Sequence, residues 1–362
     1  MNKHIFYVAA ACVALASCVK NEVRVNAPDK EITFQTVVGK ASSKAIITNT
    51  TYPTNVSFGT FAYFYPESFG TNTQLYISNA EVKNNTGATS GNVWTTDPAY
   101  YWPKQGKLTF YSYSPYTIHD KVSCTETDGL KIENYDVDAN QDIDIMVADR
   151  KDDQTQNGEN AGYNGVPTVF RHKLAQVVKF TIATKDDYAK GTVAAPKVGD
   201  KRFFVKEIKI GNIAYKGTFE SGIEPKFENK GTWTKTSDKK DSYTWYSNTT
   251  GVEFTKANPA TPSTITNGYL LVLPQEMTDK GSSEVTSVEY IQITYDIRTY
   301  WGTAEGNYST ETVTQSVDLK SVSASWEVNK KYSYNITVGL DQIYWAPSVV
   351  EWEDGTTTNI TF

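Results

Sequence analysis

The stretch KYSYNITVGL, residues 331–340, decides the fold class of this chain. Its apolar and aromatic residues stand at every second position, with small or polar residues between them. Successive side chains of a β-strand point to opposite faces of a sheet, so this alternation predicts a strand with one buried face. A helix would need apolar residues every three to four positions, and no segment keeps that period over three turns.

Shorter versions of this pattern recur on both sides of the stretch. They predict strands over residues 31–38, 56–65, 107–113, 142–148, 168–184, 201–213, 268–273, 287–297 and 349–362. The first of these places on one face Ile32, Phe34, Thr36 and Val38. The strand over residues 168–184 places on one face Val178, Phe180 and Ile182. Many short strands separated by turn residues predict an all-β protein built from β-sandwiches.

The composition supports an all-β fold and sets limits on function. The chain has 24 Tyr, 15 Phe and 8 Trp but only 3 Met, and aromatic residues suit a pleated, half-buried surface. Its 362 residues suggest about two domains. The net charge of −6 is spread without long runs, whereas a nucleic-acid-binding protein needs a basic face. We therefore expect no nucleic acid among the partners.

The N-terminus has the order of regions that is typical of a bacterial lipoprotein signal. Lys3 and His4 form the polar start, an apolar run covers residues 5–15, and Leu-Ala-Ser-Cys ends at Cys18. A membrane-spanning helix needs about 20 apolar residues, so the run is too short to cross a bilayer. We expect residues 1–17 to be a signal peptide and Cys18 to become the acylated first residue of the mature protein. A plain secretory leader with an incidental cysteine is the alternative.

The domain boundary is predicted from a loss of apolar residues over positions 149–167. This stretch is charged and contains Gly158, Gly162 and Gly165. We expect an N-terminal β-sandwich over residues 18–160 and a C-terminal β-sandwich over residues 161–362. Once the leader and the lipid account for Cys12 and Cys18, Cys124 has no partner for an intramolecular disulfide. Stability must then come from packing.

No sequence motif indicates catalysis. Beyond the leader the histidines are His119 and His172, and His172 stands between Arg171 and Lys173 in a predicted strand. The chain has no Gly-x-Ser-x-Gly elbow, no His-Glu-x-x-His and no glycine loop for phosphate. We therefore expect no enzymatic activity and no cofactor.

A run of acidic residues has the spacing of a calcium-binding loop. Asp136, Asp138, Asn140, Asp142 and Asp144 place oxygen ligands at alternate positions. The sixth residue of the run is not the glycine, and the twelfth is not the glutamate, that an EF-hand requires. A looser calcium site and a simple polar lead-in to a strand both remain open.

The aromatic residues raise the possibility of sugar binding. Tyr100, Tyr101 and Trp102 are consecutive, and aromatic faces stack on pyranose rings. The competing interpretation is that these side chains fill the sandwich core. Their alternation with polar residues in the predicted strands favours the core.

Several short motifs follow one another along the chain. They are Tyr101-Trp102-Pro103, Leu108-Thr109-Phe110, Tyr113-Ser114-Pro115, Asp144-Ile145-Met146-Val147-Ala148, Phe170-Arg171-His172-Lys173-Leu174-Ala175, Leu271-Val272-Leu273-Pro274-Gln275, and Trp326 ahead of Tyr332-Ser333-Tyr334. This ordered series resembles the fimbrillin family of Bacteroidota, the subunits, tips and anchors of type V pili. The resemblance covers essentially the whole chain after the leader.

The resemblance implies two transthyretin-like β-sandwich domains, a lipoprotein precursor and assembly by strand exchange. In that family a protease cuts after a basic residue that follows the first strand, and the strand leaves. The C-terminal strand of a neighbouring subunit then fills the groove. The exchange makes physical sense because the groove exposes unpaired backbone groups and apolar surface until an added strand covers both.

On this chain the resemblance makes residues 31–38 the removable strand. The cut is then expected between Lys44 and Ala45, with Lys40-Ala41 as second choice. Many members carry arginine where this chain has lysine, so an uncleaved anchor or accessory subunit stays open. The donor strand would lie within residues 349–362 and present Thr358, Ile360 and Phe362 on one face.

These expectations together predict a structural pilus subunit with a role in adhesion. Its location would be the outer membrane and the fimbrium. Its partners would be other pilus subunits, the membrane through the lipid, and the processing protease. The alternative is a non-enzymatic surface lipoprotein that binds glycans.

Overall fold

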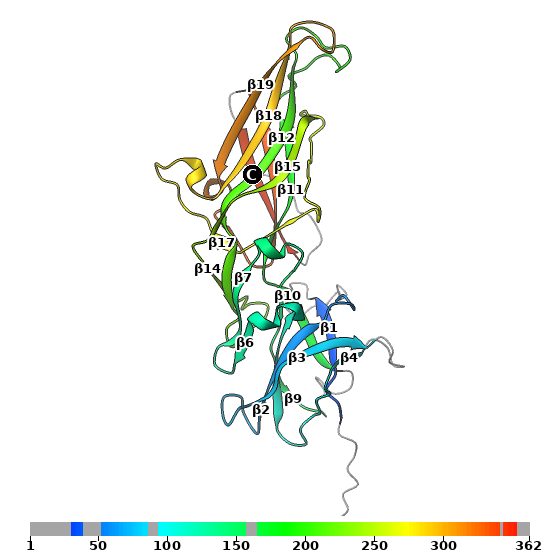
Figure 1. Cartoon of the computed structure of the whole chain (residues 1–362), viewed down its shortest axis with the longest axis vertical. Helices are drawn as coiled ribbons and strands as arrows, with labels where there is room; N and C mark the ends of the chain where they lie inside the picture. The colour runs from blue at the N-terminus through cyan, green and yellow to red at the C-terminus, as the bar shows by residue number, and fades with distance from the viewer. Residues whose placement is uncertain (1–29, 39–51, 86–92, 157–164, 341–342, 353–362) are drawn as a thin grey trace, which may run out of the picture.

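The structure, a computed structural model, describes residues 30–38, 52–85, 93–156, 165–340 and 343–352. Within these residues the chain is almost entirely strand, which confirms the all-β fold class. The helical elements there are short: η1 (Tyr116–Lys121), η2 (Asp138–Asn140), η3 (Val285–Ser287) and α1 (Leu319–Val322). The molecule is elongated, with β1 and β2 at one end and β18 and β19 at the other (Figure 1).

The strands of the described residues fall into five sheets. The first half of the chain contributes β1 (Phe34–Val38), β2 (Phe58–Tyr65), β3 (Gln74–Asn85), β4 (Val93–Thr96), β5 (Lys107–Ser114), β6 (Val122–Thr125), β7 (Gly129–Asp136), β8 (Met146–Ala148), β9 (Lys151–Gln154) and β10 (Val166–His172). The second half contributes β11 (Ala175–Thr184), β12 (Lys201–Ala214), β13 (Lys216–Glu220), β14 (Thr232–Lys235), β15 (Lys239–Phe254), β16 (Leu270–Val272), β17 (Gln275–Glu276), β18 (Tyr290–Tyr300), β19 (Tyr308–Asp318), β20 (Ser325–Trp326), β21 (Lys330–Val338) and β22 (Ile343–Glu351).

The N-terminal sheet has eight strands in the order β2-β3-β4-β1-β10-β8-β5-β9. It closes on itself because β2 pairs with β5 as well as with β3. Alternation along β2 explains why both faces of this sheet are covered. Phe58 and Ala62 point into the core that also contains β1, whereas Phe61 and Tyr63 point into a second core.

The second core lies under a smaller sheet that joins the two halves of the chain. Its order is β14-β13-β7-β6, so two strands from after residue 160 lie beside two strands from before it and meet them at the β13–β7 pair. In β13, Phe219 pairs with Ile132 of β7, and both side chains are fully buried. The two halves are thus connected by backbone pairing and by a shared core as well as by the covalent chain.

The C-terminal half is a sandwich of two four-stranded sheets, β16-β11-β21-β22 and β15-β12-β18-β19. Its core contains apolar residues from both layers, among them Phe180, Ile208, Ile293 and Tyr334. Most of the stretch that predicted the fold class lies in β21, where the aromatic and apolar residues from Tyr332 to Val338 are buried at every second position. The strand ends at Val338, so Leu340 lies beyond it and is exposed. The transthyretin-like character of the two units stays a prediction.

One strand prediction is wrong. Residues 168–184 do not form a single strand but end β10 and form β11, which lie in different sheets. The chain crosses between sheets at residues 173 and 174, where the N–H of Lys173 donates to the Ile145 carbonyl and the Leu174 carbonyl accepts from the N–H of Asn329. A bulge after Val177 then shifts the alternation, so Val177 is buried where Val178 was expected.

The pairing of β10 helps to place the end of the N-terminal unit. β10 lies between β1 and β8, among the strands of the N-terminal sheet. The division between residues 160 and 161 stays a prediction, and this pairing favours a division near Leu174 instead.

Candidate functional site: the slot of the first strand

The first strand occupies a slot in the N-terminal sheet. β1 lies between β4 and β10. Five consecutive residues, Phe34 to Val38, pair in parallel with Val166 to Phe170, whereas Phe34 alone pairs with Trp94 of β4. Ahead of β1, the N–H of Ile32 donates to the Tyr100 carbonyl at 2.8 Å. Residues 34–38 are therefore held mainly along the β10 edge, whereas residues 30–32 pair with residues 100–102.

The floor of the slot is aromatic. Ile32 and Phe34 are each 1% exposed and Val38 is 8% exposed, which confirms the predicted inner face; Thr36 is only half-buried. The Phe34 ring meets Phe58 and Phe110 edge-on, with ring centroids 5.6 and 5.7 Å apart. Full burial of such a side chain contributes roughly 1.5–3 kcal/mol. An empty slot would expose this surface to water.

One glycine allows β10 to approach β1 closely. Gly165, directly before β10, has φ +108°, and an added Cβ would lie 2.8–3.0 Å from the backbone atoms of Phe34. Only glycine adopts this backbone conformation without strain, and only glycine leaves room for the first strand. The slot is thus shaped by backbone as well as by side chains.

No backbone N–H donor is missing from the edge that β10 turns toward the slot. The N–H of Val166 donates to the Thr33 carbonyl at 2.7 Å, so by alternation the N–H groups of Thr168 and Phe170 face β1 as well. Pro167 has no N–H to offer, and its position in the alternation faces away from β1. A strand in the slot therefore meets no missing donor along β10.

The residues that the sequence assigned to processing and exchange lie outside the described residues. This holds for Cys18, for Lys44 and Ala45, and for Thr358, Ile360 and Phe362. Of the predicted donor segment, Val349 to Glu351 belong to β22, which pairs with β21 at the edge of a C-terminal sheet. The structure therefore describes the slot and the start of the donor segment.

The acidic run does not converge on one point. The Asp136 carboxylate accepts from the N–H of Ala139, Asp138 pairs with Lys240 at 2.8 Å, and Asp144 accepts from His172 at 2.6 Å. Among the described residues, no three His, Cys, Asp or Glu side chains are grouped so as to hold a metal ion. The run forms η2 and the approach to β8.

The consecutive aromatic residues do not form one surface. Trp102 is 5% exposed and packs in the core with Phe110, whereas Tyr101 is 46% exposed. Tyr100 and Tyr76 approach each other at 56° between ring planes. This arrangement presents no flat platform for a sugar ring, which supports the core interpretation for Trp102.

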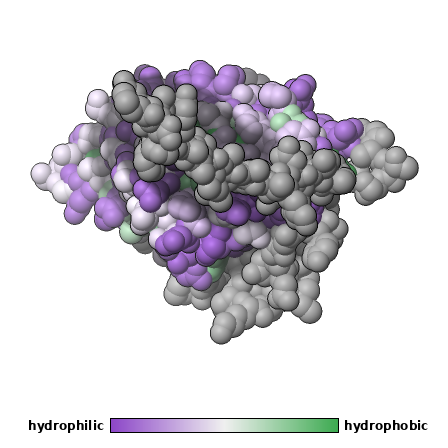
Figure 2. Space-filling view, turned by 90° about the horizontal axis from the view of Figure 1, so that it is seen from below, coloured by the Kyte–Doolittle hydropathy of each residue, from purple (hydrophilic) through white to green (hydrophobic). Residues whose placement is uncertain are grey.

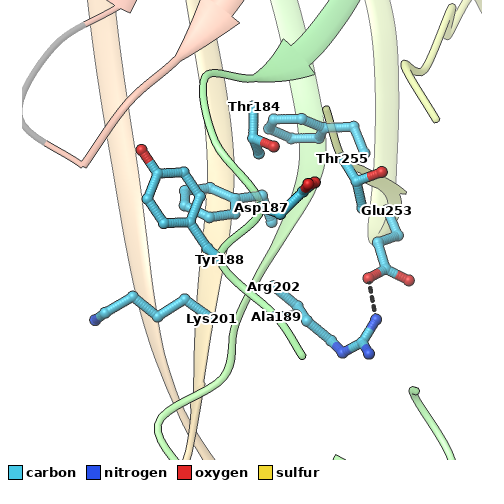
Figure 3. Close-up of a pocket in the computed structure, with 10 residues that line it drawn as sticks. Thr184, Asp187, Tyr188, Ala189, Lys201, Arg202, Glu253 and Thr255 are labelled. Carbon is cyan, nitrogen blue, oxygen red and sulfur yellow. Dashed lines mark hydrogen bonds and ion pairs between the residues drawn. The ribbon is translucent and has the colours of Figure 1, made fainter. Parts of the chain in front are cut away.

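Two hollows in the described part of the chain differ in size. One of about 40 Å³ lies beside the Arg202–Glu253 ion pair and is far smaller than a ligand pocket of roughly 300–1,000 Å³ (Figure 3). The other, of about 500 Å³, is lined by Ser123, Thr125, Thr127, Asp128, Gly129, Leu130, Lys131, Glu220, Gly222 and Ile223, with no aromatic side chain to stack on a sugar. Neither has the lining expected of a glycan site.

The surface at the end that contains the slot is mainly hydrophilic. Viewed from that end, the described residues show only small, separate hydrophobic spots (Figure 2). The inner-face side chains of β1, Phe34 and Val38, are buried inside the sheet. No helix of the described residues combines the length and apolar character needed to span a bilayer.

Comparison with known proteins identifies the family. The model of the fimbrillin-like family matches residues 43–352, and the chain therefore belongs to this family, as its motifs indicated. Family membership supports a pilus subunit located in cell-surface fimbriae. No curated protein sequence matches the chain.

The fold agrees with that of one solved structure, and two further solved structures resemble the chain less. A fimbrial protein from Bacteroides vulgatus is 19% identical, with a TM-score of 0.60, over 90% of this chain and all of that one. The tip fimbrial protein Mfa3 from Porphyromonas gingivalis, truncated at its C-terminus, is 10% identical, with a TM-score of 0.42, over 90% of this chain and all of that one. The fimbrial anchor protein Mfa2 from the same organism is 10% identical, with a TM-score of 0.34, and the match covers 90% of this chain and 98% of that one.

Proposed function

We propose that this protein is a structural subunit of a type V pilus, with a role in adhesion and no catalytic activity, and that it assembles by strand exchange at the slot of β1. The observation that carries the proposal is the position of β1. It is buried between two strands of its sheet, yet residues 39–51 are its only covalent connection to the remainder of the fold. A single cut there leaves β1 held by non-covalent contacts alone.

In this proposal the protease cuts between Lys44 and Ala45, and β1 leaves. The open slot then takes the donor segment of another subunit, with Thr358, Ile360 and Phe362 facing the aromatic floor. The unpaired edge of β10 and the floor around Phe58 and Phe110 are both unfavourable in water, so a new strand is bound through backbone hydrogen bonds and buried side chains together.

The precursor is proposed to be an outer-membrane lipoprotein acylated at Cys18. One acyl chain holds a protein only marginally and several hold it firmly, so full lipidation suits a precursor that waits at the membrane. Replacing Cys18 by alanine is expected to abolish acyl labelling and release the precursor from membranes. Unchanged labelling of the C18A variant would reject this assignment.

The N-terminal residue of protein recovered from surface fibres tests the exchange. We expect a chain that begins at Ala45. A chain in the fibre that still begins at the lipidated Cys18 would identify an anchor that retains β1.

Deletion of Thr356 to Phe362 tests the donor segment. A donor acts on another subunit, so the truncated monomer should keep its melting temperature while polymerisation is lost. A truncated protein that unfolds, or that still polymerises, would show that this segment is not the donor.

A further inference from the structure

The outer edge of β19 is long and regular. β19 lies at the end of the sheet β15-β12-β18-β19, and all eleven of its residues, from Tyr308 to Asp318, pair with β18 without a shift of register. Figure 1 shows β19 on the outer side of the C-terminal half, running close to the long axis of the molecule. None of the described strands pairs with its other edge, so that edge lacks a partner strand within this part of the chain.

Two backbone hydrogen bonds at the ends of β19 show which of its groups face outward. The N–H of Trp301 donates to the Asn307 carbonyl at 3.0 Å, and the N–H of Leu319 donates to the Glu289 carbonyl at 2.7 Å. Successive residues of an antiparallel strand turn their backbone groups to opposite sides, so the odd-numbered residues of β19 face β18. The outward backbone groups belong to Tyr308, Thr310, Thr312, Thr314, Ser316 and Asp318.

The two ends of this outward row are already used. The Tyr308 N–H donates to the Gly306 carbonyl at 3.1 Å, and the Asp318 carbonyl accepts from the Ser321 hydroxyl at 2.9 Å. Between them, the outward backbone groups of residues 310–316 make no hydrogen bond to any described residue. This free stretch is the part of the edge that can bind another strand.

The free stretch has none of the usual protection of a sheet edge. Long edge strands commonly carry a proline, lysines or a bulge that prevents pairing with other chains. β22 contains Pro347, and β15 carries Lys239 and Lys240 and shifts register twice against β12. The other edge strands of the described sheets have four residues or fewer. β19 has no proline, no lysine and no bulge, so it is the exception among these edges.

The side chains of β19 hold this edge in a fixed shape. On the outer face, the Thr312 hydroxyl donates to the Asp296 carboxylate at 2.7 Å, and the hydroxyls of Thr314 and Thr294 lie 3.1 Å apart. On the inner face, Val313 packs against the core of the C-terminal sandwich. An edge that is already ordered loses little conformational freedom when a second strand binds.

The sequence of the free stretch is complementary to itself. Residues 310–316 read TETVTQS and are centred on Val313. Two copies in antiparallel full register place outward backbone groups opposite outward backbone groups, as a hydrogen-bonded ladder requires. The opposed residues are Thr310 and Ser316, Glu311 and Gln315, Thr312 and Thr314, and Val313 with its own copy.

The side chains favour this register over its alternatives. No charge meets a like charge, and pairs of threonine with threonine or serine stabilise sheets. An axis moved by one residue, to Thr312 or Thr314, would pair five of the seven free positions and place Glu311 opposite a valine. Parallel pairing in register would place Glu311 beside its own copy, and like charges on neighbouring strands are destabilising.

We propose that two copies of this protein pair through their β19 edges, antiparallel about a two-fold axis at Val313, so that two four-stranded sheets join into one sheet of eight strands. Such an interface is isologous, because the same surface serves both copies. The partner that this edge fits is thus a second copy of the chain. The pairing uses neither the slot of β1 nor the C-terminal segment.

The two-fold axis has a consequence for fibres, and this consequence rests on the proposed function. Because β19 runs close to the long axis of the molecule, the pairing reverses the direction of the second copy (Figure 1). Fibres on one cell point away from it, so antiparallel pairs join the fibres of two facing cells. One strand pair is smaller than the roughly 1,200–2,000 Å² of a stable interface, but repetition along two fibres adds avidity. The inferred role is adhesion between cells that carry the same pilus.

Disulfide trapping tests the position of the axis. At the axis the two Val313 residues form a non-hydrogen-bonded pair, with Cα atoms about 4.5 Å apart, a distance that a disulfide spans. V313C should therefore link two copies. E311C is the matched control, because Glu311 is exposed on the same face of β19 but stands about 14 Å along the strand from its own copy. E311C should link to Q315C instead.

The experiment uses the full, uncut chain with its three native cysteines replaced by alanine, so that β1 stays in its slot. After mild oxidation we expect disulfide-linked dimers of V313C and of an equimolar mixture of E311C and Q315C. E311C alone should give roughly 10-fold fewer dimers, because its sulfur atoms are out of reach of each other. Non-reducing electrophoresis and peptide mass mapping identify the linked residues. Because no cut is made, the result does not depend on strand exchange.

The other outcomes overturn the proposal. Dimers of E311C as abundant as those of V313C would show parallel or random contact. The absence of dimers from V313C and from the mixture would show that a second copy does not occupy this edge, and a strand of an unrelated protein would then be its partner.

Proline at position 312 separates backbone pairing from chance collision. The Thr312 N–H faces outward and makes no bond to any described residue, so T312P leaves the pairing with β18 intact. T312A is the control, since it also loses the bond from the hydroxyl to Asp296 but keeps the N–H. In the V313C chain, T312P should slow disulfide formation roughly 10- to 100-fold relative to T312A, because each copy loses one backbone hydrogen bond to the other.

The melting temperatures of T312P and T312A should be similar, which shows that the proline variant is folded. T314P removes the next outward N–H and repeats the test if T312P does not fold. Equal rates of disulfide formation in the proline and alanine variants would overturn pairing through the β19 backbone.

Discussion

β1 and β12 both have a partner strand on each side, but they are held to different degrees. β12 pairs over ten positions with β15 and over ten with β18. β1 pairs over five positions with β10 and at one with β4. A strand can therefore lie inside a sheet without being firmly attached to it. A buried strand can be the part of a fold that is easiest to remove.

The largest effect is expected from the F34A variant. The Phe34 ring fills the floor of the slot, and truncation of a buried phenylalanine costs about 3–5 kcal/mol. We expect this loss in the free energy of unfolding of the uncut chain, measured by urea denaturation.

F203A in β12 is the matched comparison, because Phe203 is equally buried. When the chain is cut within residues 39–51, F34A should accelerate loss of the β1 fragment in gel filtration, whereas F203A should leave the fragment bound. Equal retention of the fragment in both variants would contradict the difference between the two strands.

The next largest effect is expected from G165A. Its Cβ would press on the Phe34 backbone, and overpacking of this kind costs about 1–3 kcal/mol. G199A is the control, since Gly199 has a similar φ of +91° but nothing within 4 Å of an added Cβ. In the uncut chain, G165A should lower the melting temperature more than G199A does. After removal of β1 the two variants should melt at similar temperatures. A difference that persists without β1 would show that the contact with Phe34 is not the cause.

A smaller effect is expected at the start of β12. Burial alone would raise the pKa of Asp200, but its carboxylate accepts the N–H groups of Lys190, Gly191 and Lys197, and these bonds hold the pKa below its usual range. A carboxyl whose pKa is lowered on folding stabilises the protein above its unfolded pKa of about 3.9, and this contribution is lost as the pH falls through the folded pKa.

We therefore expect D200N to cost about 1–3 kcal/mol at pH 7 and progressively less as the pH falls below about 4. Amide hydrogen exchange at Lys190 and Gly191 measures the loss locally. The start of β1 is held at Ile32 by a backbone hydrogen bond, so exchange there should not follow this pH dependence. If amide exchange at Ile32 followed the same pH dependence as at Lys190 and Gly191, the effect of pH would be on global stability.

The smallest effect on stability concerns Cys124 in β6. Burial is the main cause that raises the pKa of its thiol, to about 12, and its side chain packs beside the second core. At pH 8 we expect it to react with a thiol reagent roughly 10- to 1,000-fold more slowly than in the urea-unfolded chain, because the thiolate is the reactive form. Rapid reaction of the native protein would show that β6 opens readily and is held no better than β1.

The sequence predicted those strands whose two faces differ. β21 buries apolar residues in strong alternation, whereas β12 buries a continuous run from Arg202 to Val205 and alternates only in part after it; both strands were expected from their sequences. β19 and much of β15 were not expected, because their exposed, polar residues give no such signal. The break between β10 and β11 was missed since Leu174 is apolar and continues the pattern.

The slot could be predicted only in part. Its inner face was correctly read from Ile32, Phe34 and Val38. Its partner strand could not be predicted, since residues 34–38 and 166–170 are far apart in sequence and parallel pairing leaves no local pattern. The stack of Trp352 on His172 joins residues 180 positions apart, and neither residue carries a sequence signal for the other.

The sheet shared by β7 and β13 has a mechanical consequence. Tension that passes along the molecule from one half to the other must cross an antiparallel pair and the core beneath it, and cannot be absorbed by a loose linker. We expect each subunit to behave as a rigid rod under load. A fibre joined by the proposed strand exchange would flex at the joints between such rods, so its stiffness would be set by the strand in each slot.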